Sequence, residues 1–204
     1  MRVLTTVLVL ASATLLQAAP LGPPTQLFPA PGEPDPVGAN LLISSGALGF
    51  ATANYTGTLT SNVYNNDASN PFGPGALTFT YLLSNNPGST DALHRLTVQG
   101  FTSFLTDASW QSSPGGVSIA PTLIDRQSAD VVGFSFEAFG PGTLTPGASS
   151  KVLVVQTNAT AYTTTLANVQ DGLNTQVGTY SPAPEPASLA LLTLGLLAVA
   201  RRRK

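Results

Sequence analysis

The chain contains one histidine, His94, which is the first residue to consider for catalysis. A Ser–His–Asp arrangement needs a nucleophilic serine and an acidic residue that orients the imidazole. Asp91 lies close before His94 and serines are plentiful, so the residue types are present. The sequence has no Gly-x-Ser-x-Gly motif, the turn that presents a nucleophilic serine in many hydrolases. We therefore expect a structural or exposed histidine and assign no catalytic residue.

Paired carboxylates could serve glycoside hydrolysis, which needs two acidic side chains across a cleft. Asp125 and Asp130 flank Arg126, and Glu137 lies among phenylalanines. Their spacing matches no characteristic motif. We expect the two aspartates to be solvated in a loop and Glu137 to lie on an exposed strand face, and a secreted hydrolase stays only as the second alternative function.

Metal and cofactor chemistry has little support in the residue types. The segment 65–70 offers oxygen ligands of the kind that calcium uses, but Asp67 is its single carboxylate and the spacing is not that of an EF-hand. The absence of cysteine excludes thiol catalysis, dithiol redox chemistry and thiolate metal sites. We therefore expect an ordinary Asn-rich turn, no metal site and no cofactor.

Trp110 is the single tryptophan and the best candidate for contact with carbohydrate. It lies in a polar stretch before a Pro-Gly-Gly turn, and exposed aromatic rings can stack on sugar faces. The alternative is a tryptophan that covers the edge of the core with its indole N–H hydrogen-bonded. A carbohydrate-binding module is accordingly the first alternative function.

Charge further restricts the classes of partner. Between residues 19 and 183, Arg95, Arg126 and Lys151 are the only basic residues against nine acidic ones, which gives a net charge of −6. Nucleic-acid binding needs a basic surface, so we expect no nucleic-acid partner.

The elements that must position these side chains are strands. Alternation of apolar and polar residues from Phe50 to Val63 predicts one long strand with one buried face. Turn signals rich in Gly, Pro and Asn separate it from the later segments. Further strands are predicted at 77–83, 94–98, 132–138, 151–156 (central, because it alternates little), 161–166 and 175–180. About eight strands without a helix between the two ends predict an all-β fold, a single sandwich or jelly-roll-like domain.

Four regions follow along the chain. Residues 1–18 combine a basic start, an apolar stretch and small residues, the pattern of a secretory signal peptide. Residues 19–36 form a Pro-rich arm, expected to be an extended spacer because proline is excluded from helix interiors and central strands. Residues 37–180 form the sandwich domain, and residues 181–204 form the tail, in which 181–183 are expected to be a linker.

The tail contains a short apolar segment and a basic end. Residues 187–200 carry no charge and favour a helix, and fourteen residues span roughly 21 Å. A hydrocarbon core of about 30 Å usually takes about 20 residues, so a helix here is short for a permanent membrane anchor. The basic residues that follow would stay in the cytoplasm under the positive-inside rule. They are Arg201, Arg202, Arg203 and Lys204.

Pro184-Glu185-Pro186, the apolar segment and the arginine cluster, in this order at the C-terminus, resemble the PEP-CTERM sorting signal. The resemblance covers about the last tenth of the chain. It implies recognition by an exosortase, a membrane protease of certain Gram-negative bacteria. It also implies transient anchoring in the inner membrane, cleavage near Pro184, Glu185 and Pro186, and delivery to the cell surface or extracellular matrix.

Together these observations predict an exported, non-enzymatic surface or matrix protein with a structural or adhesive role in exopolysaccharide or biofilm. Its expected partners are an exosortase, the membrane before processing, and extracellular polysaccharide.

Overall fold

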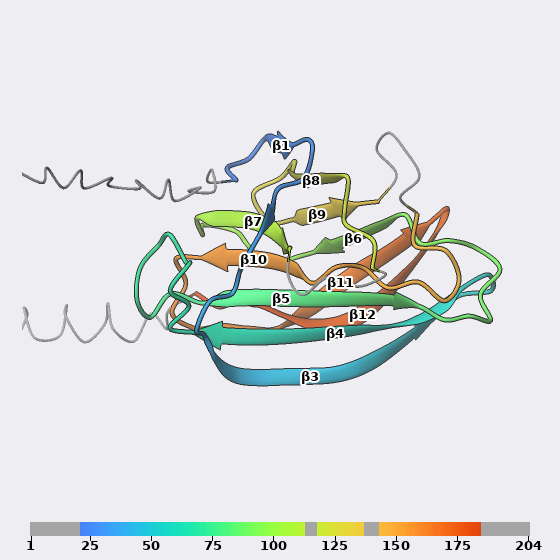
Figure 1. Cartoon of the computed structure of the whole chain (residues 1–204), viewed down its shortest axis with the longest axis horizontal. Helices are drawn as coiled ribbons and strands as arrows, with labels where there is room; N and C mark the ends of the chain where they lie inside the picture. The colour runs from blue at the N-terminus through green and yellow to red at the C-terminus, as the bar shows by residue number, and fades with distance from the viewer. Residues whose placement is uncertain (1–20, 113–117, 137–142, 185–204) are drawn as a thin grey trace, which may run out of the picture.

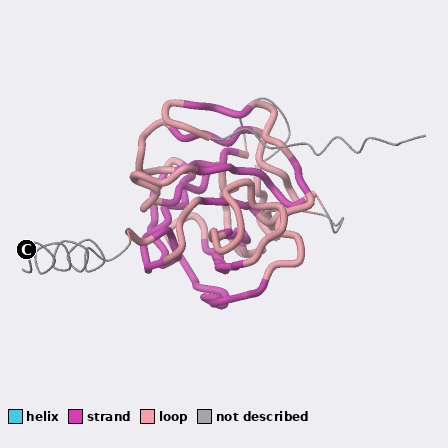
Figure 2. Tube along the Cα trace, turned by 90° about the vertical axis from the view of Figure 1, so that its left-hand side faces the viewer, coloured by secondary structure: helices cyan, strands magenta, loops and turns pink. Residues whose placement is uncertain are grey.

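The computed structural model describes residues 21–112, 118–136 and 143–184, and within these ranges the chain forms strands and no helix. The strands make two sheets of six. In spatial order, sheet I contains β1 (Thr25–Leu27), β8 (Leu123–Arg126), β9 (Val132–Ser135), β6 (Arg95–Val98), β11 (Tyr162–Asp171) and β12 (Leu173–Pro182). Sheet II contains β2 (Gly32–Glu33), β7 (Thr106–Gln111), β10 (Leu153–Thr157), β5 (Thr78–Asn85), β4 (Thr56–Asn65) and β3 (Asn40–Ala51). Figure 1 shows the two sheets as layers of a sandwich, and Figure 2 shows the same arrangement from the end. The part of the chain that the structure describes contains no membrane-spanning helix.

The core lies between the sheets and consists of side chains that alternate inward along the strands. Sheet II contributes Leu59, Phe79 and Val155, and sheet I contributes Leu96 and Phe134, all of them fully buried. The alternation that predicted strands at 77–83 and 94–98 therefore has its physical cause in this shared core. The expected central position of the 151–156 strand is also confirmed, because β10 lies between β7 and β5.

The predicted long strand from Phe50 to Val63 is wrong, because the segment turns back on itself. Strand β3 ends at Ala51 and β4 begins at Thr56, and the two pair antiparallel. The Thr52 hydroxyl accepts hydrogen bonds from the amides of Asn54 and Tyr55, and the Thr52 amide donates to the Tyr55 carbonyl over 2.8 Å. From Tyr55 onward the predicted buried and exposed faces are correct. The alternation in the sequence also continues through the turn at residues 52–55, which contains neither glycine nor proline.

The described part of the Pro-rich arm is docked on the sandwich, so the expectation of a free spacer is also wrong. Strand β1 pairs antiparallel with β8 at the edge of sheet I, and β2 pairs parallel with β7 at the edge of sheet II. The arm thus crosses from one sheet to the other before it reaches β3 (Figure 1). Its proline residues lie outside β1 and β2, so they remove no backbone donor from either strand.

The expected linker at residues 181–183 is the end of the last strand instead. Ser181 and Pro182 are buried and belong to β12, which pairs with β11 along its whole length. The Ala183 amide donates a hydrogen bond to the Ala161 carbonyl over 2.9 Å. Pro184 follows directly and is exposed, so the sandwich extends to the first residue of the Pro-Glu-Pro motif.

Candidate functional site

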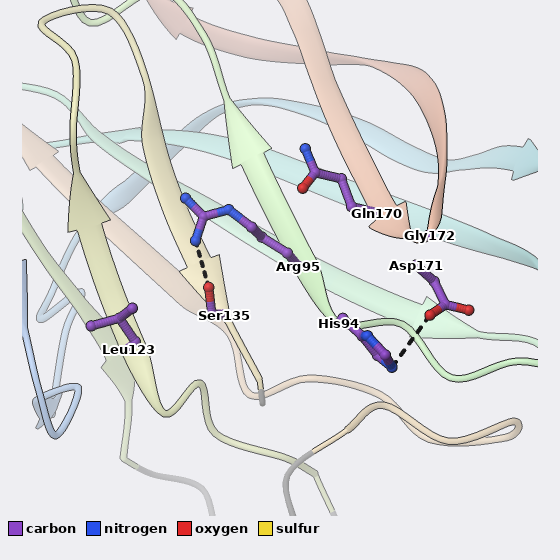
Figure 3. A pocket seen from close by; sticks show the side chains of 7 residues that line it. All are labelled: His94, Arg95, Leu123, Ser135, Gln170, Asp171 and Gly172. Atoms are coloured by element: carbon purple, nitrogen blue, oxygen red, sulfur yellow. Dashed lines mark hydrogen bonds and ion pairs between the residues drawn. The ribbon is translucent and has the colours of Figure 1, made fainter. Parts of the chain in front are cut away.

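A groove of about 510 Å³ lies on the outer face of sheet I, and its lining comes from four neighbouring strands and one turn. Because Leu96 and Phe134 point into the core, their strand neighbours Arg95 and Ser135 point outward. Register places Arg95 opposite Ser135 on one side and Gln170 on the other. His94, Leu123, Asp171 and Gly172 complete the lining (Figure 3).

The His94 imidazole faces the Asp171 carboxylate at one end of this groove. The distance from Nε2 to Oδ1 is 3.3 Å, and the side chains are 36 % and 11 % exposed. Asp171 is held there by the tight turn between β11 and β12, where Gly172 adopts a positive φ of 63°. This φ lies in the left-handed region that favours glycine. The acidic neighbour expected from sequence, Asp91, instead accepts a hydrogen bond from Asn54 over 2.8 Å.

Arg95 crosses β9 to reach Asp125 on β8, and Gly133 makes this crossing possible. The Nη1 and Nη2 atoms of Arg95 lie 2.6 and 2.8 Å from the two Asp125 carboxylate oxygens. Register places Gly133 between them, opposite Asp125, and a Cβ built at Gly133 would lie 2.2 Å from Arg95 Nη2. Such bidentate pairs have a fixed planar geometry. Nη1 also donates to the Ser135 hydroxyl.

Substitution of Gly133 by alanine is expected to lower the free energy of unfolding by about 1–3 kcal/mol, because the new methyl group displaces Arg95 from the buried Asp125 carboxylate. Denaturant unfolding measures this change. The matched control is Gly49→Ala on β3, where a Cβ would meet its nearest neighbour only at 4.0 Å. An effect no larger at Gly133 than at Gly49 would contradict the proposed crossing.

The residue types of a Ser–His–Asp triad are present in the groove but are not assembled. Ser135 faces the Arg95 guanidinium, whereas His94 points toward Asp171 at the other side (Figure 3). The expectation that Asp125 and Asp130 are solvated in a loop is wrong for Asp125, which is 2 % exposed in β8. Asp130 accepts hydrogen bonds from the Gly100 amide and the Thr102 hydroxyl. Glu137 lies outside the described residues.

Trp110 lies on β7 beneath the arm. Its ring is partly buried against the core, and its indole Nε1 donates to the Ala30 carbonyl over 3.0 Å. Gly32 passes directly over the ring, because a Cβ built at Gly32 would lie 2.3 Å from the Cζ2 atom of Trp110. Carbohydrate contact by Trp110 stays a prediction.

The Asn-rich loop from residue 65 to 70 uses its polar groups within the fold. Asp67 accepts hydrogen bonds through both oxygens, and its partners include the Val37 amide and the Thr78 hydroxyl. The Asn70 amide group donates to the Leu77 carbonyl over 3.3 Å. Among the described residues, no three acidic or histidine side chains are grouped to hold a metal ion.

The last described residue, Pro184, begins the segment that carries the sorting motif. A family model described as the PEP-CTERM protein-sorting motif matches residues 182–204. The chain therefore carries a PEP-CTERM protein-sorting motif at its C-terminal end. Neither the curated proteins nor the solved structures include a match to the chain. Glu185, Pro186, the apolar segment, the basic residues 201–204 and the signal peptide lie outside the described residues.

The motif implies an exported protein of a Gram-negative bacterium that is transiently anchored in the membrane and processed by an exosortase. The division of the chain into a signal peptide (1–18), an arm (19–36), a domain (37–180) and a tail (181–204) stays a prediction.

Proposed function

We propose that the protein is a non-enzymatic structural or adhesive component of the cell surface or extracellular polysaccharide matrix. The sorting motif carries this proposal, because it starts where the last strand of a folded sandwich ends. Cleavage after β12 would release the sandwich with all of its described strands. A body with a net charge of −6 and a core of its own is suited to persist outside the cell without disulfides.

Fractionation of the host with and without its exopolysaccharide tests the matrix role. The processed protein is expected in the matrix of the normal host and in the culture medium of a host that makes no exopolysaccharide. An outer-membrane protein of the same host serves as the loading control. Equal retention on cells of both hosts would contradict a role in the polysaccharide matrix.

Carbohydrate binding by the groove on sheet I is the second candidate function. His94, Gln170 and Asp171 offer hydrogen-bond donors and acceptors along one open groove. The Arg95–Asp125 pair fixes the guanidinium beside them. Hydroxyl groups of a saccharide can bond to such side chains, and ordered water can bridge the remainder.

Affinity electrophoresis in gels that contain the host polysaccharide tests this candidate. The variants Gln170→Ala and Asp171→Asn are each expected to weaken binding by roughly tenfold if each removes one hydrogen bond to the saccharide. Trp110→Phe tests the sequence-based candidate in the same gels, and Asp91→Asn is the control. Unchanged mobility of both groove variants would exclude the groove as the binding site.

A further inference from the structure

Four acidic side chains cluster on the outer face of sheet II. Because Ala108 and Trp110 pack against the core, Asp107 and Ser109 on the same strand point outward. The arm covers this face with Glu33 and Asp35, and the loop between β4 and β5 adds Asp67. Asp107 and Asp35 are each 2 % exposed, and Glu33 is 8 % exposed.

The arm is attached to β7 through its backbone and through one of these carboxylates. The Trp110 amide donates to the Pro31 carbonyl over 3.1 Å, and the Ser112 amide donates to the Glu33 carbonyl over 2.7 Å. The Ser109 hydroxyl donates to Asp35 Oδ2 over 3.0 Å. Beyond this point the Val37 amide donates to Asp67 over 2.9 Å. The acidic side chains therefore lie at the contact between the arm and the sheet.

The charges that act on these carboxyl groups are other carboxylates. Burial and then the charges of Asp35 and Asp107 raise the pKa of Glu33 to about 7. Burial and the charge of Asp35 raise the pKa of Asp107 to about 7 as well. Burial also raises the pKa of Asp35, in spite of the hydrogen bond that the Ser109 hydroxyl donates to its carboxylate. The basic residues Arg126 and Lys151 are not among the causes of these pKa shifts. Arg126 donates hydrogen bonds to loop carbonyls, and Lys151 lies before β10.

Hydrogen bonding separates Asp67 from the other three acidic residues. Burial alone would raise the pKa of Asp67, but donors that include Ser69, the Val37 amide, Thr78 and Gln156 outweigh it and lower the pKa.

In contrast, the Oδ2 atom of Asp107 is buried without a hydrogen-bond partner. Glu33 and Asp35 lie near each other on the arm, and burial and the negative charge of Asp35 raise the pKa of Glu33. The contact between arm and sheet is thus built for protonated carboxyl groups.

We propose that Glu33, Asp35 and Asp107 form a proton-dependent clasp, which holds the arm on β7 and releases it as the pH rises above neutrality. Release uncovers Trp110, because the arm residue Gly32 lies over its ring and Ala30 accepts its indole N–H. This inference is separate from the proposed role in the polysaccharide matrix and does not depend on it.

The direction of the effect follows from the raised pKa values. A carboxyl group that binds its proton more tightly in the docked state stabilises that state fully below its ordinary pKa, 4.5 for Glu33 and 3.8 for Asp107. This stabilisation is lost as the pH rises through about 7. Above that pH, three like charges meet in a buried contact and repel one another.

The fluorescence of Trp110 tests the clasp in the mature protein purified from its host, because the chain has no other tryptophan. The emission maximum is expected to shift reversibly to longer wavelength as the pH rises from about 5 to about 9. Far-UV circular dichroism is expected to stay constant, since the sheets remain folded. An emission maximum independent of pH, or a loss of circular dichroism in the same pH range, would overturn the proposal.

Neutral variants locate the effect in the named carboxyl groups. Glu33→Gln and Asp107→Asn each remove one group that must be protonated, so each is expected to move the fluorescence transition to higher pH, and the double variant is expected to move it furthest. Asp91→Asn, which changes an acidic residue hydrogen-bonded to Asn54, is the matched control and should leave the transition unchanged. A double variant with the transition of the unaltered protein would also overturn the proposal.

Discussion

Replacement of Arg126 by methionine is expected to lower the free energy of unfolding by about 3–5 kcal/mol. Arg126 is 3 % exposed, and its Nη atoms donate to four backbone carbonyls and one hydroxyl. The acceptors belong to Leu21, Phe101, Phe104, Thr106 and Ala129. These bonds join the start of the arm to two loops and to β7, so methionine would leave several buried acceptors without a donor.

Urea unfolding followed by circular dichroism measures this loss of stability. Lys151→Met is the matched control, because it removes a partly exposed basic side chain, and its effect is expected to stay within about 0.5 kcal/mol. A change at Arg126 as small as that at Lys151 would show that the arm and loops are held by other contacts.

Replacement of Pro184, Glu185 and Pro186 by alanine is expected to stop C-terminal processing and leave the full-length C-terminus in the membrane fraction. The reason is that the protein-sorting motif begins at residue 182 and includes all three residues. The sandwich ends at Ala183, so the substitution alters no strand. Immunoblots of membrane, surface and medium fractions with an antibody against the sandwich measure the outcome.

Alanine substitution of Ser188 and Thr193 in the apolar segment is the control for this replacement. It keeps the three parts of the motif in place, and processing is expected to continue. Normal processing after loss of Pro184, Glu185 and Pro186 would show that the motif is not what the protease reads.

The all-β sandwich could be predicted because its central strands obey simple alternation. Phe79 and Tyr81 in β5 and Leu96 in β6 point into the core while their neighbours point outward. Strand β3 was not predicted because it is an edge strand with little burial on either face, so its sequence does not alternate between apolar and polar residues. Strand β7 was not predicted because Ala108 and Trp110 are its only apolar residues, so the segment has the composition of a polar stretch.

From the sequence, only the residue types in the groove could be predicted, and not how they are brought together. His94 was singled out from the sequence, but its partner Asp171 lies more than seventy positions away and is brought there by the pairing of β6 with β11. The role of Gly133 depends on the path of the Arg95 side chain across a neighbouring strand. Such contacts between distant segments leave no local signal, although a glycine within an apolar strand is itself an indication of close approach.

The intact mass of the protein recovered from the surface and matrix of its host tests the central claim most directly. The account predicts a mature form that lacks the N-terminal signal segment and the apolar tail but retains β12 through Ala183, found outside the cell. A full-length C-terminus in the membrane fraction would contradict it and would define a permanently anchored surface domain instead.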